Sequence, residues 1–105
     1  MIQYTVVFSP EAQAHLIELY WYIAEAAAPD IAARYTNDLV DYCESLRTFP
    51  MRGIDRGDIR PGLRITNFRR RTVIAFAVHS QLVTVLGIFH GGQEYEDFLQ
   101  GDEGG

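Results

Sequence analysis

"FSPEAQAHLIELYWYIAEAAAP", residues 8–29, is the stretch that decides the fold. Ser9 can cap an orphan backbone N–H with its hydroxyl, Pro10 suits the first helical position, and Glu11 complements the positive end of a helix dipole. Apolar residues then recur every three or four positions, which turns one stripe of a helix of about 27 Å toward a core. The stripe comprises Ala12, Leu16, Leu19, Tyr20, Ile23, Ala26 and Ala27. The stretch therefore predicts an amphipathic helix that ends before Pro29.

A second helix is predicted to begin near Asp30 and to end at Pro50, because proline cannot continue a helix. Its inward positions keep the same spacing and are Ile31, Tyr35, Leu39, Tyr42, Cys43 and Leu46. Since the link between the helices is short, they should form an antiparallel hairpin. Upstream, residues 3–8 ("QYTVVF") are rich in β-branched and aromatic residues and predict a strand.

Three apolar runs after the helices predict further strands, at residues 63–69, 72–79 and 82–89. The last run has almost no polar face, so it should lie centrally in the sheet and be covered on both sides. Residues 50–62 ("PMRGIDRGDIRPG") have turn chemistry and predict a loop. The order β-α-α-β-β-β predicts an α+β fold in which the antiparallel helical hairpin packs on one face of a mostly antiparallel sheet, with the other face available for a partner.

Length and composition bound the class of protein. The 105 residues suit one domain, expected over residues 1–100, with a flexible tail at residues 101–105. No segment is apolar enough to anchor the chain in a membrane, and the start lacks the pattern of a secretory signal, so we expect a cytoplasmic protein. The single Cys43 excludes an intramolecular disulfide, and three scattered histidines make a metal site improbable. We expect no cofactor.

Charge is strongly segregated along the chain. Residues 1–46 contain seven acidic residues and one arginine, whereas residues 47–71 contain eight arginines and two aspartates. Residues 72–105 add five acids and no base, and the chain has no lysine. Arginine presents a flat fork of donors that suits carboxylates and phosphates, which fits docking onto an anionic partner. The alternative is that arginine-for-lysine usage reflects a GC-rich genome.

Four motifs in this order resemble the ParE/RelE superfamily, the small toxins of bacterial type II toxin-antitoxin systems. They are the opening stretch quoted above, "CESLRTFPMRG", "IRPGLRI" and "VTVLGIFHGGQEYEDFL". RelE-like members cut mRNA on the ribosome, whereas ParE-like members poison DNA gyrase. The long helical hairpin, the "FPMRG" and "PGLR" motifs and the "FHGG" ending are similar to the ParE branch. The resemblance therefore implies a gyrase-poisoning toxin that is not an enzyme.

The resemblance also implies two alternatives, a RelE-like mRNA endonuclease and a toxin-fold protein that only binds an antitoxin as a regulator. Cleaving RNA needs a base, an acid and cations. The candidates are His90 or Glu94 as base, Tyr95 or His79 as acid, and Arg64 with Arg69, Arg70 and Arg71 as the phosphate clamp. We favour structural roles for His90, which ends a strand before two glycines, and for Tyr95, which is spaced like a packing residue.

A toxin that acts by binding a protein needs fewer specialised residues than a nuclease, because arginines and aromatic residues are enriched at interface hot spots. The candidate target-binding residues are Arg64, Arg69, Arg70, Arg71, Tyr95 and Phe98. The three consecutive arginines can equally be read as a solvated turn that protects a sticky strand. Arg64 matches "PGLR" and forms either an ion pair with a helix acid or part of the active surface.

Three successive aromatic residues, Tyr20, Trp21 and Tyr22, cannot all face one core, so Trp21 should be partly exposed. As the resemblance implies, a ParD-like antitoxin would cover these residues with a segment that folds on binding. The implied partners are this antitoxin, DNA gyrase and, through the antitoxin, operator DNA.

Overall fold

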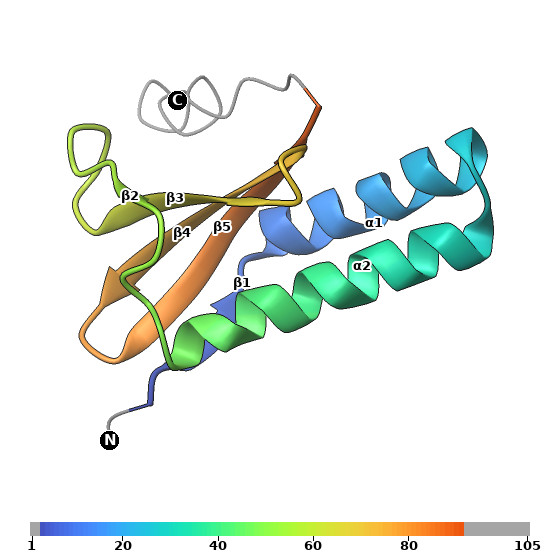
Figure 1. The fold of residues 1–105 in the computed structure, drawn as a ribbon. Coiled ribbons are helices and arrows are strands. Elements are labelled where there is room, and N and C mark those ends of the chain that lie inside the picture. The colour runs from blue at the N-terminus through green and yellow to red at the C-terminus, as the bar shows by residue number, and fades with distance from the viewer. Residues whose placement is uncertain (1–2, 92–105) are drawn as a thin grey trace.

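Two helices lie on one face of a five-stranded mixed sheet in this protein (Figure 1). The computed structural model describes residues 3–91. The elements are β1 (Thr5–Phe8), α1 (Pro10–Ala26), α2 (Pro29–Glu44), a short 3₁₀ helix η1 (Ser45–Arg47), β2 (Ile54–Asp55), β3 (Leu63–Phe68), β4 (Thr72–His79) and β5 (Leu82–His90). The α+β fold with its antiparallel hairpin is confirmed. The short strand β2 lies in the segment for which the sequence predicted only a loop.

The sheet order is β1-β5-β4-β3-β2, with β1 parallel to β5 and every other neighbouring pair antiparallel. β5 was expected to lie centrally; it is an interior strand between β1 and β4, and β4 is the middle strand of the sheet. The predicted helix start is confirmed. The hydroxyl of Ser9 accepts a hydrogen bond from the backbone N–H of Ala12 and donates one to the carbonyl of Leu86, both at 3.1 Å. One side chain thus caps α1 and joins it to β5.

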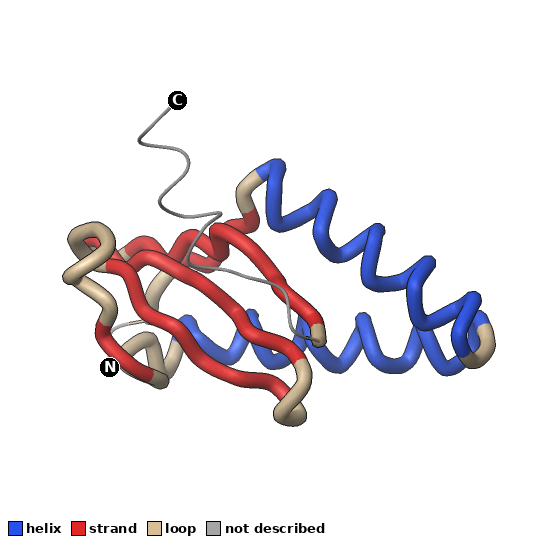
Figure 2. Tube along the Cα trace, turned by 90° about the horizontal axis from the view of Figure 1, so that it is seen from above, coloured by secondary structure: helices blue, strands red, loops and turns tan. Residues whose placement is uncertain are grey.

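The main core lies between the hairpin and the sheet. Leu19 from α1, Leu39 and Cys43 from α2, and Phe76 and Val85 from the sheet are buried in one cluster. The helices lie along the sheet, but the linked end of the hairpin extends past it (Figures 1 and 2). The core therefore does not reach that end.

Three positions that the helical spacing assigned to the core are exposed, namely Ala26, Ala27 and Ile31. Ala26 and Ala27 stand at the projecting end of the hairpin. Because α2 begins at Pro29, its inward stripe runs through the fully buried Ala32, and Ile31 lies one position off that stripe.

The face of the sheet away from the helices is not bare, which corrects the expectation of an uncovered surface. Alternate residues of a strand point to opposite faces. Leu63 and Ile65 of β3 accordingly form a second buried cluster with Ala75 and Phe89, and Ile59 from the preceding loop packs on it. This face contributes to stability as a smaller second core.

The proposed domain limits at residues 100 and 101, and the expected packing role of Tyr95, lie outside the described residues. Among residues 3–91, no helix has both the length and the apolar character needed to span a membrane.

Candidate functional site

The turn between β3 and β4 consists of Arg69, Arg70 and Arg71, which we call the arginine turn. Arg69 and Arg70 have φ angles of 51° and 67°, in the left-handed region that hairpin turns usually fill with asparagine or glycine. Arg70 and Arg71 are exposed, and within residues 3–91 neither forms an ion pair. Two guanidinium groups are thus presented to solvent at the tip of a hairpin.

Arg69 differs from its two neighbours because it is anchored to α2. Its guanidinium donates to Asp38 Oδ2 at 2.7 Å and lies over the rings of Phe68 and Tyr35, at 4.8 and 5.5 Å from the ring centres. An acid of the helical half thus neutralises one of the three arginines.

Other arginines of the cationic segment are also used within the chain. Arg56 makes two hydrogen bonds to Asp58, which hold the pKa of that carboxyl below its ordinary value. Arg52 donates to the hydroxyl of Ser45 and lies over the ring of Tyr42. The eight arginines therefore do not form one cationic surface. The positive charge that residues 47–71 expose to a partner is smaller than their sequence suggests.

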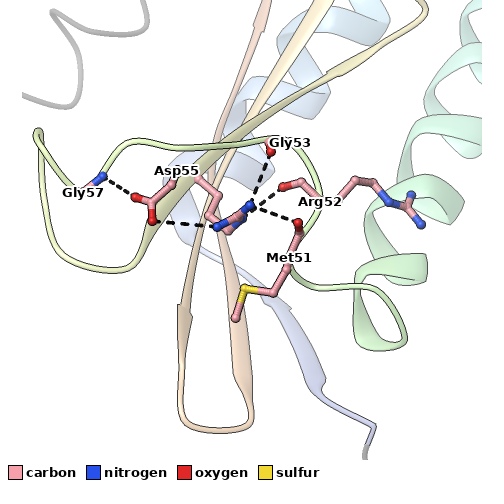
Figure 3. Close-up of polar contacts among 6 residues, drawn as sticks. Met51, Arg52, Gly53, Asp55 and Gly57 are labelled. Atoms are coloured by element: carbon pink, nitrogen blue, oxygen red, sulfur yellow. Dashed lines mark hydrogen bonds and ion pairs between the residues drawn. The ribbon is translucent and has the colours of Figure 1, made fainter.

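Arg64 holds the loop that follows η1, whose residues Met51, Arg52 and Gly53 are labelled in Figure 3. Its guanidinium donates to the backbone carbonyls of Met51, Arg52 and Gly53, at 2.9, 3.1 and 3.3 Å. Nη1 lies 4.0 Å from Oδ2 of Asp55, which is in β2, so the expected ion pair with a helix acid is wrong. Only 16% of the Arg64 side chain is exposed. These contacts fix the loop against β3.

Gly53 is required where this loop meets the sheet. Its φ angle is 79°, and a Cβ atom at this position would lie 2.2 Å from the carbonyl oxygen of Ile65. Only a residue without a side chain lets the backbone approach β3 this closely.

His90 ends β5 within a chain of hydrogen bonds. The hydroxyl of Tyr35 is 2.7 Å from that of Thr72, which is 2.9 Å from Nδ1 of His90. The ring of Tyr22 packs edge-on against the imidazole at 5.6 Å. Burial, and secondarily the charge of Arg71, lower the pKa of His90, which favours the neutral imidazole.

His90 also lines a pocket of about 420 Å³ between α1 and the end of β5. The lining residues are His15, Glu18, Leu19, Tyr22, Ile88, His90 and Gly91. His15 has a structural role there, because its Nδ1 accepts a hydrogen bond from the backbone N–H of Ile88 at 3.0 Å, beyond the point where β1 ends. Imidazole, phenol and carboxyl groups thus meet in one pocket, with Nδ1 of each histidine already engaged.

The structure separates some residues that the nuclease hypothesis grouped together. His79 and His90 lie at opposite ends of the sheet. His90 pairs with Thr72, the first residue of β4, and His79 is seven residues further along the same strand. At about 3.3 Å per residue, this separation of some 23 Å excludes them as acid and base of one reaction. Glu94, Tyr95 and Phe98 lie outside the described residues.

The expected exposure of Trp21 is confirmed, at 59%. Tyr22 is also exposed, and the rings of Tyr20 and Trp21 meet edge-on at 5.2 Å. Ile17, one helical turn before Trp21, is 60% exposed and extends the apolar stripe. The sequence reasoning missed Ile17, although its spacing of four residues from Trp21 could have indicated it.

Further residues around the arginine turn and His90 were also missed, namely His15, Asp38 and Thr72. The partners of Asp38 and Thr72 come from segments 18 to 37 residues away in sequence. Local periodicity could not have indicated these pairings. A polar residue at the start of an otherwise apolar strand was the one available signal for Thr72.

Comparisons with known proteins agree with this architecture. The family described as "ParE toxin of type II toxin-antitoxin system, parDE" matches residues 6–95. Among solved structures, the chain is similar to one from the chromosomal ParDE system of Pseudomonas aeruginosa (TM-score 0.73, 21% identity, covering 85% of this chain and 97% of that one). It is also similar to one from the toxin-antitoxin complex RelBE2 of Mycobacterium tuberculosis (TM-score 0.62, 21% identity, covering 89% and 97%). No curated protein matches the sequence. Since the family match spans most of a chain that has the same fold, the protein belongs to the ParE family of type II toxins.

Proposed function

We propose that this ParE-family toxin arrests growth by poisoning DNA gyrase, and that the arginine turn is one contact with its target. In this proposal the toxin is a cytoplasmic binding protein that breaks no bond itself. A ParD-like antitoxin neutralises it and connects the pair to operator DNA.

The exposed, strained arginine turn is the observation that carries the proposal. Arg70 adopts a left-handed conformation (φ 67°) in which a side chain costs free energy, and within residues 3–91 it makes no ion pair. Strained backbone conformations of this kind cluster at functional sites. A pair of free guanidinium groups suits an acidic protein surface or the phosphates of a gyrase–DNA complex.

The mRNA endonuclease alternative has less support. Its phosphate clamp would need Arg64, whose guanidinium is already bound to three backbone carbonyls. Its base would be His90, whose Nδ1 is engaged with Thr72. None of the described residues that line the neighbouring pocket is an arginine, so the pocket has no phosphate clamp of its own.

The apolar stripe of Ile17 and Trp21 supports an antitoxin contact on α1. Large exposed apolar side chains that lie together usually mark an interaction site. Tyr22 extends the stripe toward the pocket, and Tyr20 supports the ring of Trp21. Trp21 is the only tryptophan, so its fluorescence reports this surface directly. Iodide quenching of Trp21 should fall when the antitoxin binds, and unchanged quenching would contradict the contact.

A gyrase supercoiling reaction tests the main proposal. Wild-type protein should leave linear plasmid after the gyrase is digested, whereas Arg70→Gln/Arg71→Gln should leave much less. Arg69 is kept because it is paired with Asp38. Arg34→Gln is the control, since it removes an exposed arginine that belongs to neither proposed contact and should keep full activity.

The same preparations added to a translation extract separate the alternatives. Fragmented mRNA with intact plasmid would replace the gyrase proposal by the nuclease reading. An inactive wild-type protein in both assays, together with antitoxin binding, would favour the non-toxic regulator.

A further inference from the structure

The loop after η1 presents two large apolar side chains to solvent. Phe49 and Met51 are 62% and 63% exposed, although Pro50 between them is buried. They line a shallow groove of about 560 Å³ together with Thr48, Pro50 and Arg52, which we call the 48–52 groove. Neighbouring exposed apolar side chains around a depression are typical of a protein-binding surface.

Hydrogen bonds within the chain hold the 48–52 groove in shape. Arg64 binds the carbonyls of Met51 and Arg52 at 2.9 and 3.1 Å, and Nη1 of Arg52 donates to the hydroxyl of Ser45 at 3.0 Å. The loop therefore needs little ordering when a partner binds. A surface that is ordered in advance loses less conformational entropy on binding, which favours affinity.

The groove's surroundings indicate the chemistry of the partner. The guanidinium of Arg52 lies over the rings of Tyr42 and Phe49, at 4.9 and 5.6 Å from their centres, and Arg47 is exposed in η1 just before the groove. No acidic residue is among the described residues that line it. Apolar floors with cationic edges suit a protein segment that offers an apolar side chain beside carboxylates. DNA phosphates would leave Phe49 and Met51 without a partner.

The groove is connected to the arginine turn by a row of ring contacts. Arg52 lies over Tyr42, the ring of Tyr42 is 5.5 Å from that of Phe68, and the guanidinium of Arg69 is 4.8 Å from Phe68. This row follows the seam between α2 and β3. One partner can therefore contact the groove and the arginine turn along the same seam.

We propose that the 48–52 groove is a second contact with the target protein and takes an apolar side chain flanked by carboxylates. Arg64 is its positioning residue, which acts through the loop and does not touch the target. This inference rests on the proposed function, with gyrase as the target. It assigns Arg64 a role different from the direct contact that the sequence suggested.

Binding of purified gyrase subunits and plasmid linearisation test the groove with two matched double variants. Phe49→Ser/Met51→Ser removes an aromatic and an aliphatic side chain from the groove. Ile17→Ser/Trp21→Ser removes the same kinds of side chain, at 60% and 59% exposure, from α1. The groove variant should bind gyrase roughly tenfold more weakly or worse, and the α1 variant should bind it like wild type.

Each outcome decides between the proposals. If wild type linearises plasmid and the groove variant equals it, the groove inference is wrong and the gyrase proposal stands. If wild type is inactive, both are wrong. A loss confined to binding of a labelled DNA duplex, with unchanged affinity for the gyrase subunits, would also overturn the groove inference, because it would make DNA the occupant.

Arg64→Lys tests the positioning role separately. Lysine keeps the charge but cannot reproduce the guanidinium fork, so amide hydrogen exchange near residues 51–53 should accelerate and gyrase affinity should fall. In the Arg64→Lys background the groove substitutions should cost less than in wild type, because both changes affect the same contact. Additive effects would overturn the positioning role, with melting temperature confirming that each variant is folded.

Discussion

Replacing Arg70 by asparagine should stabilise the protein. Arg70 has a φ angle of 67°, is exposed, and makes no ion pair within residues 3–91. A left-handed conformation costs an ordinary L-residue roughly 1–2 kcal/mol, and asparagine tolerates it better because its short side chain can hydrogen-bond locally. Asparagine is preferable to glycine here, because glycine also increases the entropy of the unfolded chain.

The expected gain in unfolding free energy is about 0.5–1 kcal/mol, the part of the strain that asparagine relieves. For a domain of this size a change of 1 kcal/mol moves the melting temperature by roughly 4–5 °C. Arg70→Asn should therefore raise the melting temperature by about 2–5 °C.

Arg69→Asn is the matched comparison, since Arg69 has a φ angle of 51° in the same turn. This substitution also relieves strain, but it removes the contact with Asp38 and the stacking on Phe68. Exposed interactions of these kinds contribute up to about 1 kcal/mol each. The losses offset the gain, so the melting temperature should change little or fall.

Differential scanning calorimetry of both variants beside wild type measures these shifts. A melting temperature that falls or stays constant in Arg70→Asn would refute the strain reasoning. If the variant is stabilised and still traps gyrase as wild type does, the strain is real but the arginine turn is not the target contact.

Three further predictions concern buried or constrained groups. Burial, with a smaller contribution from Glu44, raises the pKa of the Cys43 thiol to about 12. A thiol reagent at pH 8 should therefore label the folded protein only slowly and the unfolded protein at once. Rapid labelling of the folded protein would contradict the packing. Burial lowers the pKa of His90 below its ordinary 6.5, so the unfolded state binds more protons than the folded state just below that pH. The free energy of unfolding should therefore fall as the pH drops through 6.5, and it should fall less in His90→Asn. Gly53→Ala should destabilise the fold by more than Gly91→Ala, because both positions have positive φ but only at Gly53 does the new Cβ meet backbone; equal losses of melting temperature would refute the clash.

Sequence periodicity predicted the parts of this fold that depend on local chemistry. Ser9 and Pro10 start α1 as expected, since capping involves neighbouring residues. Ile31 was misassigned because periodicity gives the spacing of a stripe but not its rotation, which packing decides. The strand β2 was missed because its two residues form a strand only by pairing with β3.

The candidate site was less predictable for a related reason. Trp21 could be placed at the surface because three successive aromatic residues on a helix cannot share one face. The roles of Arg64 and Arg69 could not be predicted, because their partners lie 11 to 31 residues away in sequence. Residue type showed that these side chains could bind anions, and only the fold shows that they bind the chain's own carbonyls and carboxylate.

The arginines of this molecule differ in whether their contacts stabilise the fold. A guanidinium that is satisfied by backbone carbonyls, as in Arg64, or by a carboxylate and two rings, as in Arg69, gives its interaction energy to the fold. Arg70 makes no such contribution within the described residues and costs strain. Glycine or asparagine would hold the same turn at lower cost. This cost, with no ion pair of Arg70 among the described residues to offset it, supports the proposal that Arg70 binds an anionic partner.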